Sequence, residues 1–440
     1  MTEKRYQSWG RYPKVTQNAH NLYWRDDSLP TQAMSGKSFL PIGNCRSYGD
    51  VCLNDGGIVM NCRHLDHFIQ FDQATGLLRC EAGVLLSEIL QLTVAKGWFL
   101  PVTPGTQFVT VGGAIANDVH GKNHHKAGTF GQHVRSFELL RSDGTRLICS
   151  TNENSEYYQA TIGGLGLTGI ITWAEIQLHP IKNAYIDQEI IRYNNLSEFF
   201  AIARESDQDF EHTVAWIDCL AKDKQIGRGL FIRGNYAETI GAKTPRHFSK
   251  RISFPLDPPF TLVNHLSLKL FNTLYFNKQR TDRIQGQIHH QPFFYPLDAI
   301  HSWNRIYGSK GFFQYQCAIP TEQMEDAIHE ILQRISRAGL GSFLTVLKLF
   351  GNKPSPGLLS FPMPGATLAL DFPNKGAQTL QLLSQLDEVT RSVDGRINPS
   401  KDARMSGEDF RNSYPNWVKM EQYMDPNISS SFWRRVTEAS

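Results

Sequence analysis

Three glycine-rich stretches in the first half of the chain have the composition of ligand-binding loops. They are Pro41 to Gly57 (PIGNCRSYGDVCLNDGG), Pro104 to Gly121 (PGTQFVTVGGAIANDVHG) and Gly163 to Ile171 (GGLGLTGII). Glycine lets backbone amides turn towards an anion and lets the chain pass close to a flat ligand. The first stretch could therefore hold a pyrophosphate, and the third could pass close to an adenine or a ribose. None of them has a G-x-G-x-x-G pattern between a strand and a helix, as a Rossmann fold would need.

Four histidines stand at or just after the end of the second stretch: His120, His124, His125 and His133. A metal site is the alternative to a loop that binds a flat ligand. The spacing gives no helical i, i+4 pair with a carboxylate, and a loop so rich in glycine is better suited to close backbone approach. We therefore expect no metal here.

A lysine interrupts an apolar strand in the second half of the chain. Ser342 to Phe350 is expected to be a strand with two apolar faces, and Lys348 shares one face with Leu344 and Val346. A lysine buried there is costly unless an anion or a strong hydrogen-bond acceptor meets it. Lys348 is therefore a candidate site residue. The alternative is a lysine that reaches solvent from the strand end or pairs with a structural aspartate.

Strands are expected in both halves of the chain, short ones with turns before Pro180 and longer ones after it. In the first half they are Gly57–Cys62, Leu77–Ala82, Phe137–Leu140 and Arg146–Cys149, the last two joined by a Ser142-Asp143-Gly144 turn. In the second half they are Phe312–Ile319, Ser342–Phe350 and Ala366–Phe372. Alternation places Gln314 and Gln316 on one face of their strand, and Thr367 on the same face as Ala369 and Asp371.

Helices are expected where caps and apolar stripes coincide. The predicted segments are Ser87–Lys96, Thr321–Ala338 and Gln378–Val393. Ser87 and Thr321 are the predicted N-terminal caps, and Gly97 and Gly339 the predicted ends.

Composition excludes several classes of protein. The 440 residues exceed the roughly 250 to 300 at which a single core stops growing, so we expect two domains. A net charge of 45 − 42 = +3 is far below the basicity of nucleic-acid-binding proteins. The seven cysteines have no CxxC spacing, which argues against a disulfide framework and a zinc site. We expect most of them to be buried thiols.

Membrane contact is suggested by one segment only. No apolar stretch reaches the roughly 18 to 20 residues that span a bilayer, and the N-terminus lacks the apolar region of a signal peptide, so we expect a cytoplasmic protein. Lys243 to Arg251 (KTPRHFSKR) concentrates positive charge just before the apolar run Ile252 to Pro255. It could meet a lipid phosphate at the inner membrane as a peripheral contact, and the alternative is a solvated loop.

Taken in order, the motifs PGT, VTVGGAI, HGKNHH, HVRS and GGLGLTGII resemble the FAD domain of the vanillyl-alcohol oxidase superfamily. Within it, the chain most resembles the enzymes that oxidise the 2'-hydroxyl of decaprenylphosphoryl ribose. The likeness continues through VAWID (214–218), FYPLDAIHSWNRIYG (294–308), QYQ (314–316), FLTVLKLFG (343–351) and SKDAR (400–404). It covers most of the chain, and its motifs are long.

The resemblance implies an α+β, two-domain FAD-binding fold of the PCMH type. Residues 1–180 would form the FAD-binding domain, and residues 181–393 a substrate-binding domain built on an antiparallel sheet flanked by helices. Residues 394–440 would return to the FAD domain and carry the catalytic lysine.

The resemblance also implies site residues. FAD would be bound by Pro41, Ile42, Gly43, Asn44, Cys45, Arg46, Ser47, Tyr48, Gly49, Asp50, Val51, Gly105, Thr110, Val111, Gly112, Gly113, Asn117, Asp118, Val119, His120, Ile171 and Asn398. The substrate would contact Trp216, Gln314, Lys348 and Thr367, and the catalytic residues would be Lys401, His120, Lys348 and Gln316. Relatives that attach FAD covalently carry His in the first loop or Cys in the second, and this chain has neither, so FAD should be non-covalent.

Lys401 would take the hydroxyl proton while a hydride leaves the carbinol carbon for the flavin. A lysine acts as a base only if burial or a nearby cation lowers its pKa, and Lys348 could be that cation. From the residues alone, a surface lysine paired with Asp402 is the favoured alternative.

The preferred interpretation is an FAD-dependent oxidase of a polyprenyl-phosphoryl pentose, the first half of a 2'-epimerisation in cell-envelope arabinose biosynthesis. A partner NAD-dependent short-chain reductase would reduce the ketone, and a quinone would reoxidise the flavin. Two alternatives remain open: an oxygen-using alditol or aldonolactone oxidase, and a flavin-binding protein without turnover.

Overall fold

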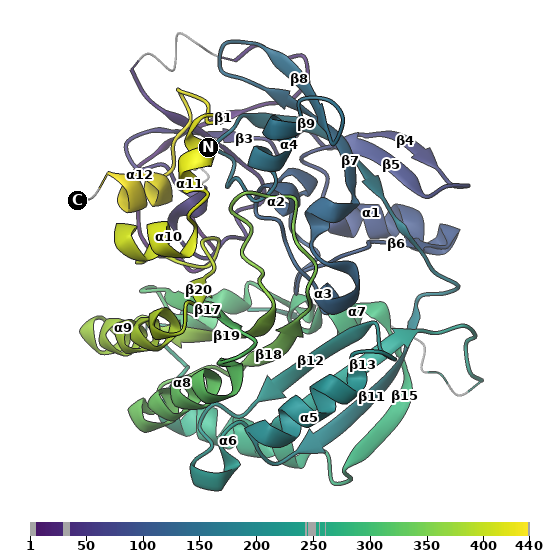
Figure 1. Ribbon diagram of the computed structural model, residues 1–440, viewed down its shortest axis with the longest axis vertical. Coiled ribbons are helices and arrows are strands. Elements are labelled where there is room, and N and C mark those ends of the chain that lie inside the picture. The colour runs from purple at the N-terminus through teal and green to yellow at the C-terminus, as the bar shows by residue number, and fades with distance from the viewer. Residues whose placement is uncertain are drawn as a thin grey trace.

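The computed structural model describes residues 6–29, 36–242, 244, 252–254, 256–259 and 261–438 (Figure 1). The basic run at 243–251 lies outside the described residues except for Thr244. The described residues form a two-part α+β fold whose second part has an antiparallel sheet flanked by helices, as the sequence predicted. In Figure 1 the N-terminal sheets and the C-terminal helices lie above a large sheet formed by the middle of the chain.

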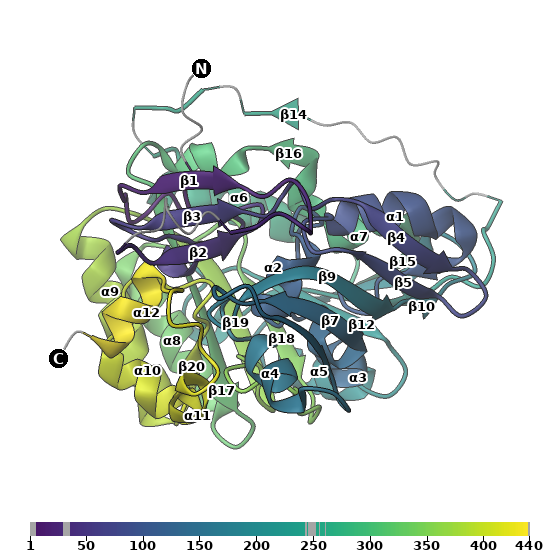
Figure 2. The ribbon, with the colours of Figure 1, turned by 90° about the horizontal axis from the view of Figure 1, so that it is seen from above.

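The N-terminal part contains two sheets. A parallel sheet has the order β1 (Asn18–Asn21), β3 (Ile58–Asn61) and β2 (Phe39–Ile42). An antiparallel sheet has the order β4 (Phe68–Asp72), β5 (Leu77–Glu81), β9 (Ile170–Gln177), β7 (Val134–Leu140) and β8 (Arg146–Ser150). The accompanying helices are α1 (Leu86–Thr93), α2 (Val111–Ala116), α3 (His124–Ala127) and α4 (Ser155–Thr161). Seen from above in Figure 2, the two sheets lie side by side.

Among the described residues, the second part is built on one antiparallel sheet, called the large sheet below. Its order is β15 (Arg283–His289), β11 (Tyr185–Tyr193), β13 (Gly229–Tyr236), β12 (His212–Ile217), β18 (Val346–Phe350), β19 (Gly365–Pro373), β17 (Phe312–Pro320) and β20 (Arg396–Ile397). Two pairs of short strands form further small sheets among the described residues: β6 (Trp98–Phe99) with β10 (His179–Pro180), and β14 (Ile252–Ser253) with β16 (Ile300–His301).

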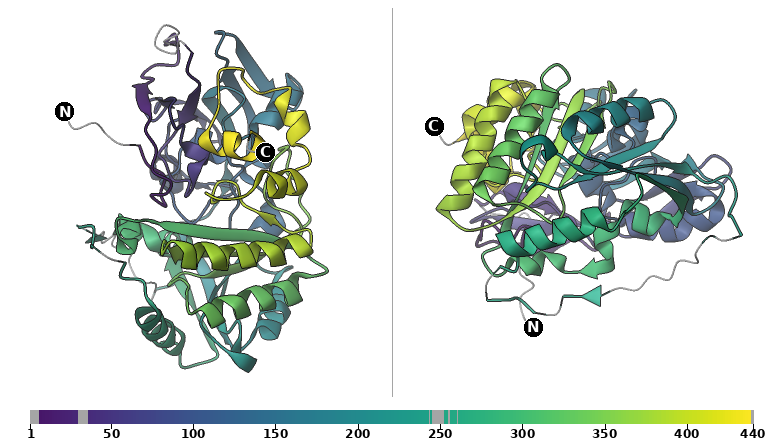
Figure 3. Two further views of the ribbon diagram at one scale, coloured as in Figure 1. Left: turned by 90° about the vertical axis from the view of Figure 1, so that its left-hand side faces the viewer. Right: turned by 90° about the horizontal axis from the view of Figure 1, so that it is seen from below.

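Helices cover one face of the large sheet. The helices after β10 are α5 (Leu196–Ser206), α6 (His265–Asn277), α7 (His290–Phe294), α8 (Met324–Ala338), α9 (Ala377–Ser392), α10 (Gly407–Ser413), α11 (Trp417–Glu421) and α12 (Ser431–Thr437). The other face borders the N-terminal part and also packs against α6, whose Phe276 clusters with Trp216 and Leu230. Figure 3 shows α8 and α9 against the face turned away from the N-terminal part. Buried side chains such as Ile331 of α8, Leu386 of α9 and Leu368 of β19 belong to one core cluster on that side. Residues of opposite parity, including Gln316 and Thr367, therefore point the other way.

Three predicted boundaries were wrong for local reasons. Ser87 lies buried inside the first turn of α1, and the amide of Leu85 is instead capped by the Glu88 carboxylate at 2.8 Å. α8 begins at Met324 rather than at Thr321, because a turn closes first, with Gln323 N donating to Pro320 O at 3.2 Å. β18 begins at Val346 rather than at Ser342, because Ser342 Oγ hydrogen-bonds both backbone groups of Leu344.

Other local predictions are confirmed. The β7–β8 hairpin turns where predicted, with Gly144 at φ 88° and Asp143 Oδ1 accepting from Thr145 N at 2.8 Å. Gly339 ends α8 at φ 64°. None of the seven cysteines, all of which lie in described parts of the chain, forms a disulfide there, and five of them are buried. A helix with the length and hydropathy needed to cross a bilayer does not occur in the part of the chain that the structure describes.

Candidate active site

A cavity of about 450 Å³ runs between the glycine-rich loops and the open face of the large sheet. The predicted cofactor residues that line it are Pro41, Ile42, Gly43, Asn44, Cys45, Arg46, Ser47, Tyr48, Val51, Gly105, Thr110, Gly112, Gly113, Asn117, Val119, His120, Ile171 and Asn398. The predicted substrate and catalytic residues that line it are Trp216, Gln314, Gln316, Lys348, Thr367 and Lys401. Folding thus brings together residues that are more than 350 positions apart in sequence.

Four of the predicted cofactor residues do not line the cavity. Val111 and Asp118 lie behind it, buried in the wall. Asp118 accepts hydrogen bonds from Gly131 N and Ser360 Oγ, so it ties loops together. Gly49 and Asp50 belong to the outer side of the first loop, where the C-terminal segment packs.

The first two glycine-rich loops pack directly on each other. A Cβ on Gly43 would lie 2.2 Å from Thr110 Oγ1, a distance that no side chain can occupy. Thr110 in turn caps α2 by accepting from Gly113 N at 3.1 Å, and Gly112 N donates to Ala82 O at 2.8 Å. These contacts fix the backbone of both loops at the cavity wall.

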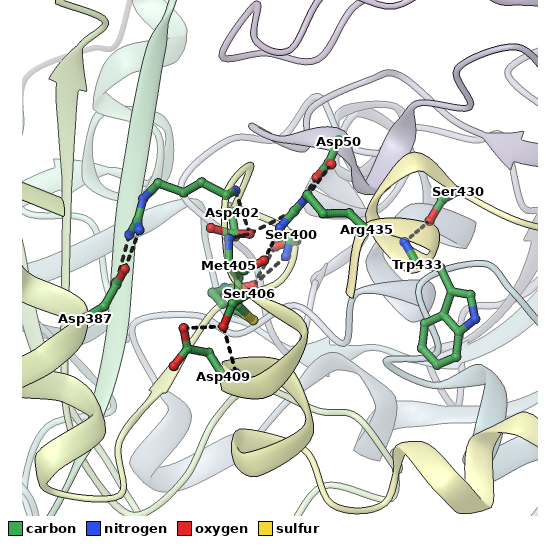
Figure 4. A network of polar contacts seen from close by, with 12 residues as sticks. Asp50, Asp387, Ser400, Asp402, Met405, Ser406, Asp409, Ser430, Trp433 and Arg435 are labelled. Atoms are coloured by element: carbon green, nitrogen blue, oxygen red, sulfur yellow. Dashed lines mark hydrogen bonds and ion pairs between the residues drawn. The ribbon is translucent and has the colours of Figure 1, made fainter. Parts of the chain in front are cut away.

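The loop that carries Lys401 is fastened to the first glycine-rich loop. Tyr48 N donates to Ser400 O at 3.0 Å, and a Cβ on Gly49 would lie 1.5 Å from Asp402 O. Figure 4 shows Arg435 between Asp50 and Asp402. Its guanidinium reaches Asp50 at 2.8 and 2.9 Å and Asp402 at 3.0 Å. The three charged side chains join the first loop, the Lys401 loop and α12.

Lys401 points into the cavity and not to solvent. Its Nζ lies 4.1 Å from the centre of the Tyr48 ring, over the ring face. Asp402, the alternative partner, is occupied by Arg435 and by the amides of Arg404 and Met405. Burial lowers the pKa of Lys401 to about 8, although the nearby Asp371 opposes that shift. About a tenth of Lys401 is therefore neutral at pH 7.

Lys348 meets a backbone carbonyl rather than an anion. Its Nζ donates to Gly121 O at 2.8 Å. Burial, together with the charges of Lys122 and Lys401, lowers the pKa of Lys348 to about 7. Lys122 lies in the same wall, where it donates to Phe293 O, and burial lowers its pKa to about 7 as well. The strand prediction identified Lys348, whereas Lys122 was overlooked within the HGKNHH motif.

A polar network connects the second glycine-rich loop with two strands and with the loop that carries Lys401. Gln316 Nε2 lies 3.1 Å from His120 Nε2 and 3.2 Å from Thr367 Oγ1. Asn398 Nδ2 donates to Gln316 Oε1 at 3.0 Å, and Ser400 Oγ donates to Asn398 Oδ1 at 2.8 Å. Burial, reinforced by Lys348, lowers the pKa of His120 well below its usual value. His120 is therefore neutral at physiological pH.

A buried carboxyl beside the cavity was not among the predicted site residues. Asp371 Oδ1 accepts from Gln314 Nε2 at 2.7 Å, and Tyr307 OH lies 3.4 Å from Asp371 Oδ2. Burial raises the pKa of Asp371 to about 7, against the opposing effects of Gln314 and Lys401. The sequence did contain a signal for Asp371: it has the same parity as Thr367 in β19, so the two side chains share one face of the strand.

The other histidines near the second loop are separately held. His125 Nε2 contacts Phe210 O at 2.9 Å, and His133 Nε2 contacts Ala127 O at 2.9 Å. His124 is buried against Phe350, with ring centres 4.5 Å apart. Among the described residues, no cluster of three or more His, Cys, Asp or Glu side chains is arranged to hold a metal.

Comparison with known proteins places this chain in a family. Residues 32–150 match a family model described as an FAD-binding domain. The decaprenylphosphoryl-β-D-ribose oxidase of Mycolicibacterium smegmatis is 36% identical over 99% of this chain and 98% of its own length. This chain belongs to that oxidase family. It is an FAD-dependent oxidoreductase.

More distant relatives share smaller parts. An uncharacterized protein of Streptomyces coelicolor is 33% identical over 80% of this chain and all of its own length. The human Δ(24)-sterol reductase is 31% identical over 27% of this chain and 23% of its own length.

The residues of this oxidoreductase fit FAD. The cavity extends from the glycine-rich loops to the large sheet, as an elongated dinucleotide requires. A Cβ on Gly105 would meet no atom within 4 Å, so the backbone there borders open space. Asn117 lines the cavity, and its Oδ1 is buried with no hydrogen-bond partner among the described residues. Such an atom is costly unless a ligand donates to it.

Proposed function

We propose that this enzyme oxidises the 2'-hydroxyl of a polyprenyl-phosphoryl ribose to a ketone. The observation that carries the proposal is the identity with the Mycolicibacterium smegmatis oxidase, which extends over 99% of this chain. The geometry supports it independently, because Lys401, a base of lowered pKa, lies in the same cavity as loops that fit FAD. The proposed electron acceptor is non-covalent FAD, which when bound accepts the hydride.

Lys401 is the proposed base. In its neutral form Nζ accepts the proton of the substrate hydroxyl as the hydride leaves the carbon that bears that hydroxyl. Its position is fixed by the Tyr48 ring and by the Asn398-to-Asp402 turn, in which Lys401 N donates to Asn398 O at 3.0 Å. Lys348, held by Gly121 O, is proposed to donate hydrogen bonds to the sugar.

Gln316 and His120 are the proposed orienting pair. Gln316 is held by Asn398 and Thr367 on either side, so its amide cannot rotate without losing hydrogen bonds. Because the pKa of His120 is lowered so far, His120 adds no charge and is a weaker proton acceptor than Lys401. Trp216, whose Nε1 donates to Phe343 O at 2.9 Å, forms with Gln314 the remaining wall that excludes water from the sugar.

The ketone must be reduced for a 2'-epimerisation to be complete. We propose that a partner NAD-dependent short-chain reductase reduces it from the opposite face, and that a quinone takes the electrons from the reduced flavin. A lipid-linked substrate and a quinone are both membrane-borne, which supports a cytoplasmic enzyme with peripheral contact at the inner membrane.

Anaerobic mixing with candidate substrates tests the proposal. The flavin absorbance should bleach with decaprenylphosphoryl ribose and stay unchanged with free alditols or aldonolactones. Bleaching by simple polyols, with peroxide formed on admission of air, would instead identify an oxygen-using alditol oxidase. No bleaching by any alcohol would identify a flavin-binding protein without turnover.

A further inference from the structure

Helix α6 exposes an apolar stripe on its outer side. Leu266, Leu270 and Leu274 are 75%, 60% and 63% exposed, and their four-residue spacing places them along one side of the helix. Single exposed leucines are ordinary, but three in a row on one helix form a continuous apolar surface that calls for a partner.

The inner side of the same helix reaches the active-site cavity. Leu268 and Phe276 are buried, and Asn272 Nδ2 donates to Asp218 Oδ1 at 2.8 Å, so the helix is firmly seated. Tyr275 lines the cavity and packs against Trp216, with ring centres 4.6 Å apart. The exposed stripe is therefore one helix diameter from the proposed substrate site. Figure 1 shows α6 at the lower end of the molecule, beneath the large sheet.

The charged residues of α6 and of the segments that directly flank it are all positive except for the histidine His265. From residue 258 to residue 281 the sequence has no Asp or Glu. Lys269, Lys278 and Arg280 in this range are all exposed. Lys278 Nζ lies 3.7 Å from the centre of the Tyr275 ring, beside the cavity wall. An apolar stripe edged by cations matches the surface of an anionic lipid bilayer, with acyl chains below and phosphates above.

We propose that α6 docks this enzyme on an anionic membrane, with its outer leucines among the acyl chains and its cations at the lipid phosphates. A substrate that remains anchored by its lipid then presents its sugar to the cavity beside α6. This presentation of a lipid-anchored substrate rests on the proposed function, whereas the docking of α6 on the membrane does not.

A second copy of the chain fits this face less well. A symmetric dimer through α6 would bring Lys269 and Lys278 of both copies together, and like charges oppose association. An anionic bilayer neutralises the same cations.

Vesicle flotation tests the docking surface. The full-length FAD-loaded protein should float with vesicles of phosphatidylglycerol and phosphatidylethanolamine, and L266Q/L270Q/L274Q should lose at least about tenfold in apparent affinity. K269Q/K278Q should weaken binding several-fold to these vesicles and leave binding to phosphatidylcholine vesicles unchanged. The matched control is I69Q/L380Q/V418Q, which alters three exposed apolar residues elsewhere and should float like the wild type.

Two results would overturn the docking proposal. The first is a leucine variant that floats as well as the wild type. The second is a wild-type protein that ignores vesicles but elutes as a dimer that L266Q/L270Q/L274Q dissociates, because α6 would then be a self-association surface.

Activity assays separate this proposal from the proposed function. With a truncated, water-soluble polyprenyl-phosphoryl ribose, the leucine variant should reduce its flavin as fast as the wild type. With the full-length substrate in vesicles it should be at least about tenfold slower. Equal loss on both substrates would place the leucines in the fold or the chemistry and contradict docking. If neither substrate bleaches the wild type while flotation succeeds, the proposed function fails and the docking surface stands.

Discussion

Lys401 and Lys348 line the same cavity, and the surroundings of each lower its pKa. For Lys401 the main cause is burial, which brings its pKa to about 8. Only the neutral amine can accept a proton, and below its pKa the neutral fraction rises with pH. The rate of flavin reduction by substrate should therefore rise about tenfold for each pH unit below about pH 8 and level off above it. Stopped-flow absorbance measures this rate, and a flat profile across this range would contradict the assignment of Lys401 as the base.

Removing the amine tests the same residue without relying on titration. Lys401→Ala should keep its bound flavin, because the bond from Tyr48 N to Ser400 O and the Arg435 ion pairs still fasten the Lys401 loop to the first glycine-rich loop. Flavin reduction should slow at least about 100-fold, the scale of general-base catalysis. The matched control is Lys419→Ala, which removes an exposed lysine on α11 and should leave the rate unchanged. A colourless Lys401→Ala protein would show that the residue supports cofactor binding instead.

At the scale of elements, the cavity depends on close packing of loops. Gly43→Ala would place a methyl group 2.2 Å from Thr110 Oγ1 and push the first two glycine-rich loops apart. The purified variant should hold at least about tenfold less flavin per protein than the wild type, because the loops that fit FAD no longer meet. Gly286→Ala is the control, since no atom lies within 4 Å of its added Cβ. Wild-type flavin content in Gly43→Ala would mean that the loops tolerate separation.

Ion pairs of Arg435 hold the C-terminal segment against the first glycine-rich loop and the Lys401 loop. Arg435 is shared by Asp50 and Asp402, whose side chains are only 4% and 2% exposed. Arg435→Gln leaves two buried carboxylates close together, so it should lower the free energy of unfolding by about 3 kcal/mol. Arg204→Gln should cost less than about 1 kcal/mol, because that arginine and its partner Glu325 are both largely exposed. Urea denaturation followed by tryptophan fluorescence measures the free energy of unfolding of both variants. Equal decreases in the two would contradict a special role of Arg435.

At the scale of the molecule, the cavity wall comes from both parts of the fold, so FAD binding and folding are coupled. FAD at about 100 times its dissociation constant should stabilise the protein by about 2.7 kcal/mol. The melting temperature should therefore rise with added FAD, as followed by fluorescence. Because the first glycine-rich loop has no His and the second has no Cys for a covalent attachment, denaturation should also release free flavin into solution. Flavin that stays with precipitated protein would contradict non-covalent binding.

Local sequence alone determined many turns, helix ends and strand faces of this protein, independently of tertiary contacts. The β7–β8 turn, the end of α8 at Gly339 and the strand alternation around Gln316 follow from residues close in sequence, because backbone preferences act locally. The caps at Ser87 and Thr321 were wrong because competing hydrogen bonds formed next to them.

Only the tertiary structure decided which charged residues share a site. Asp371 lies beside the cavity because β17 pairs with β19, which brings Asp371 opposite Gln314. Sequence could not distinguish Lys401 in a cavity from Lys401 paired with Asp402, because Arg435 occupies Asp402 from 33 positions away. Burial and charge act through space, and the pKa values on which the proposed chemistry depends arise only after distant segments have packed.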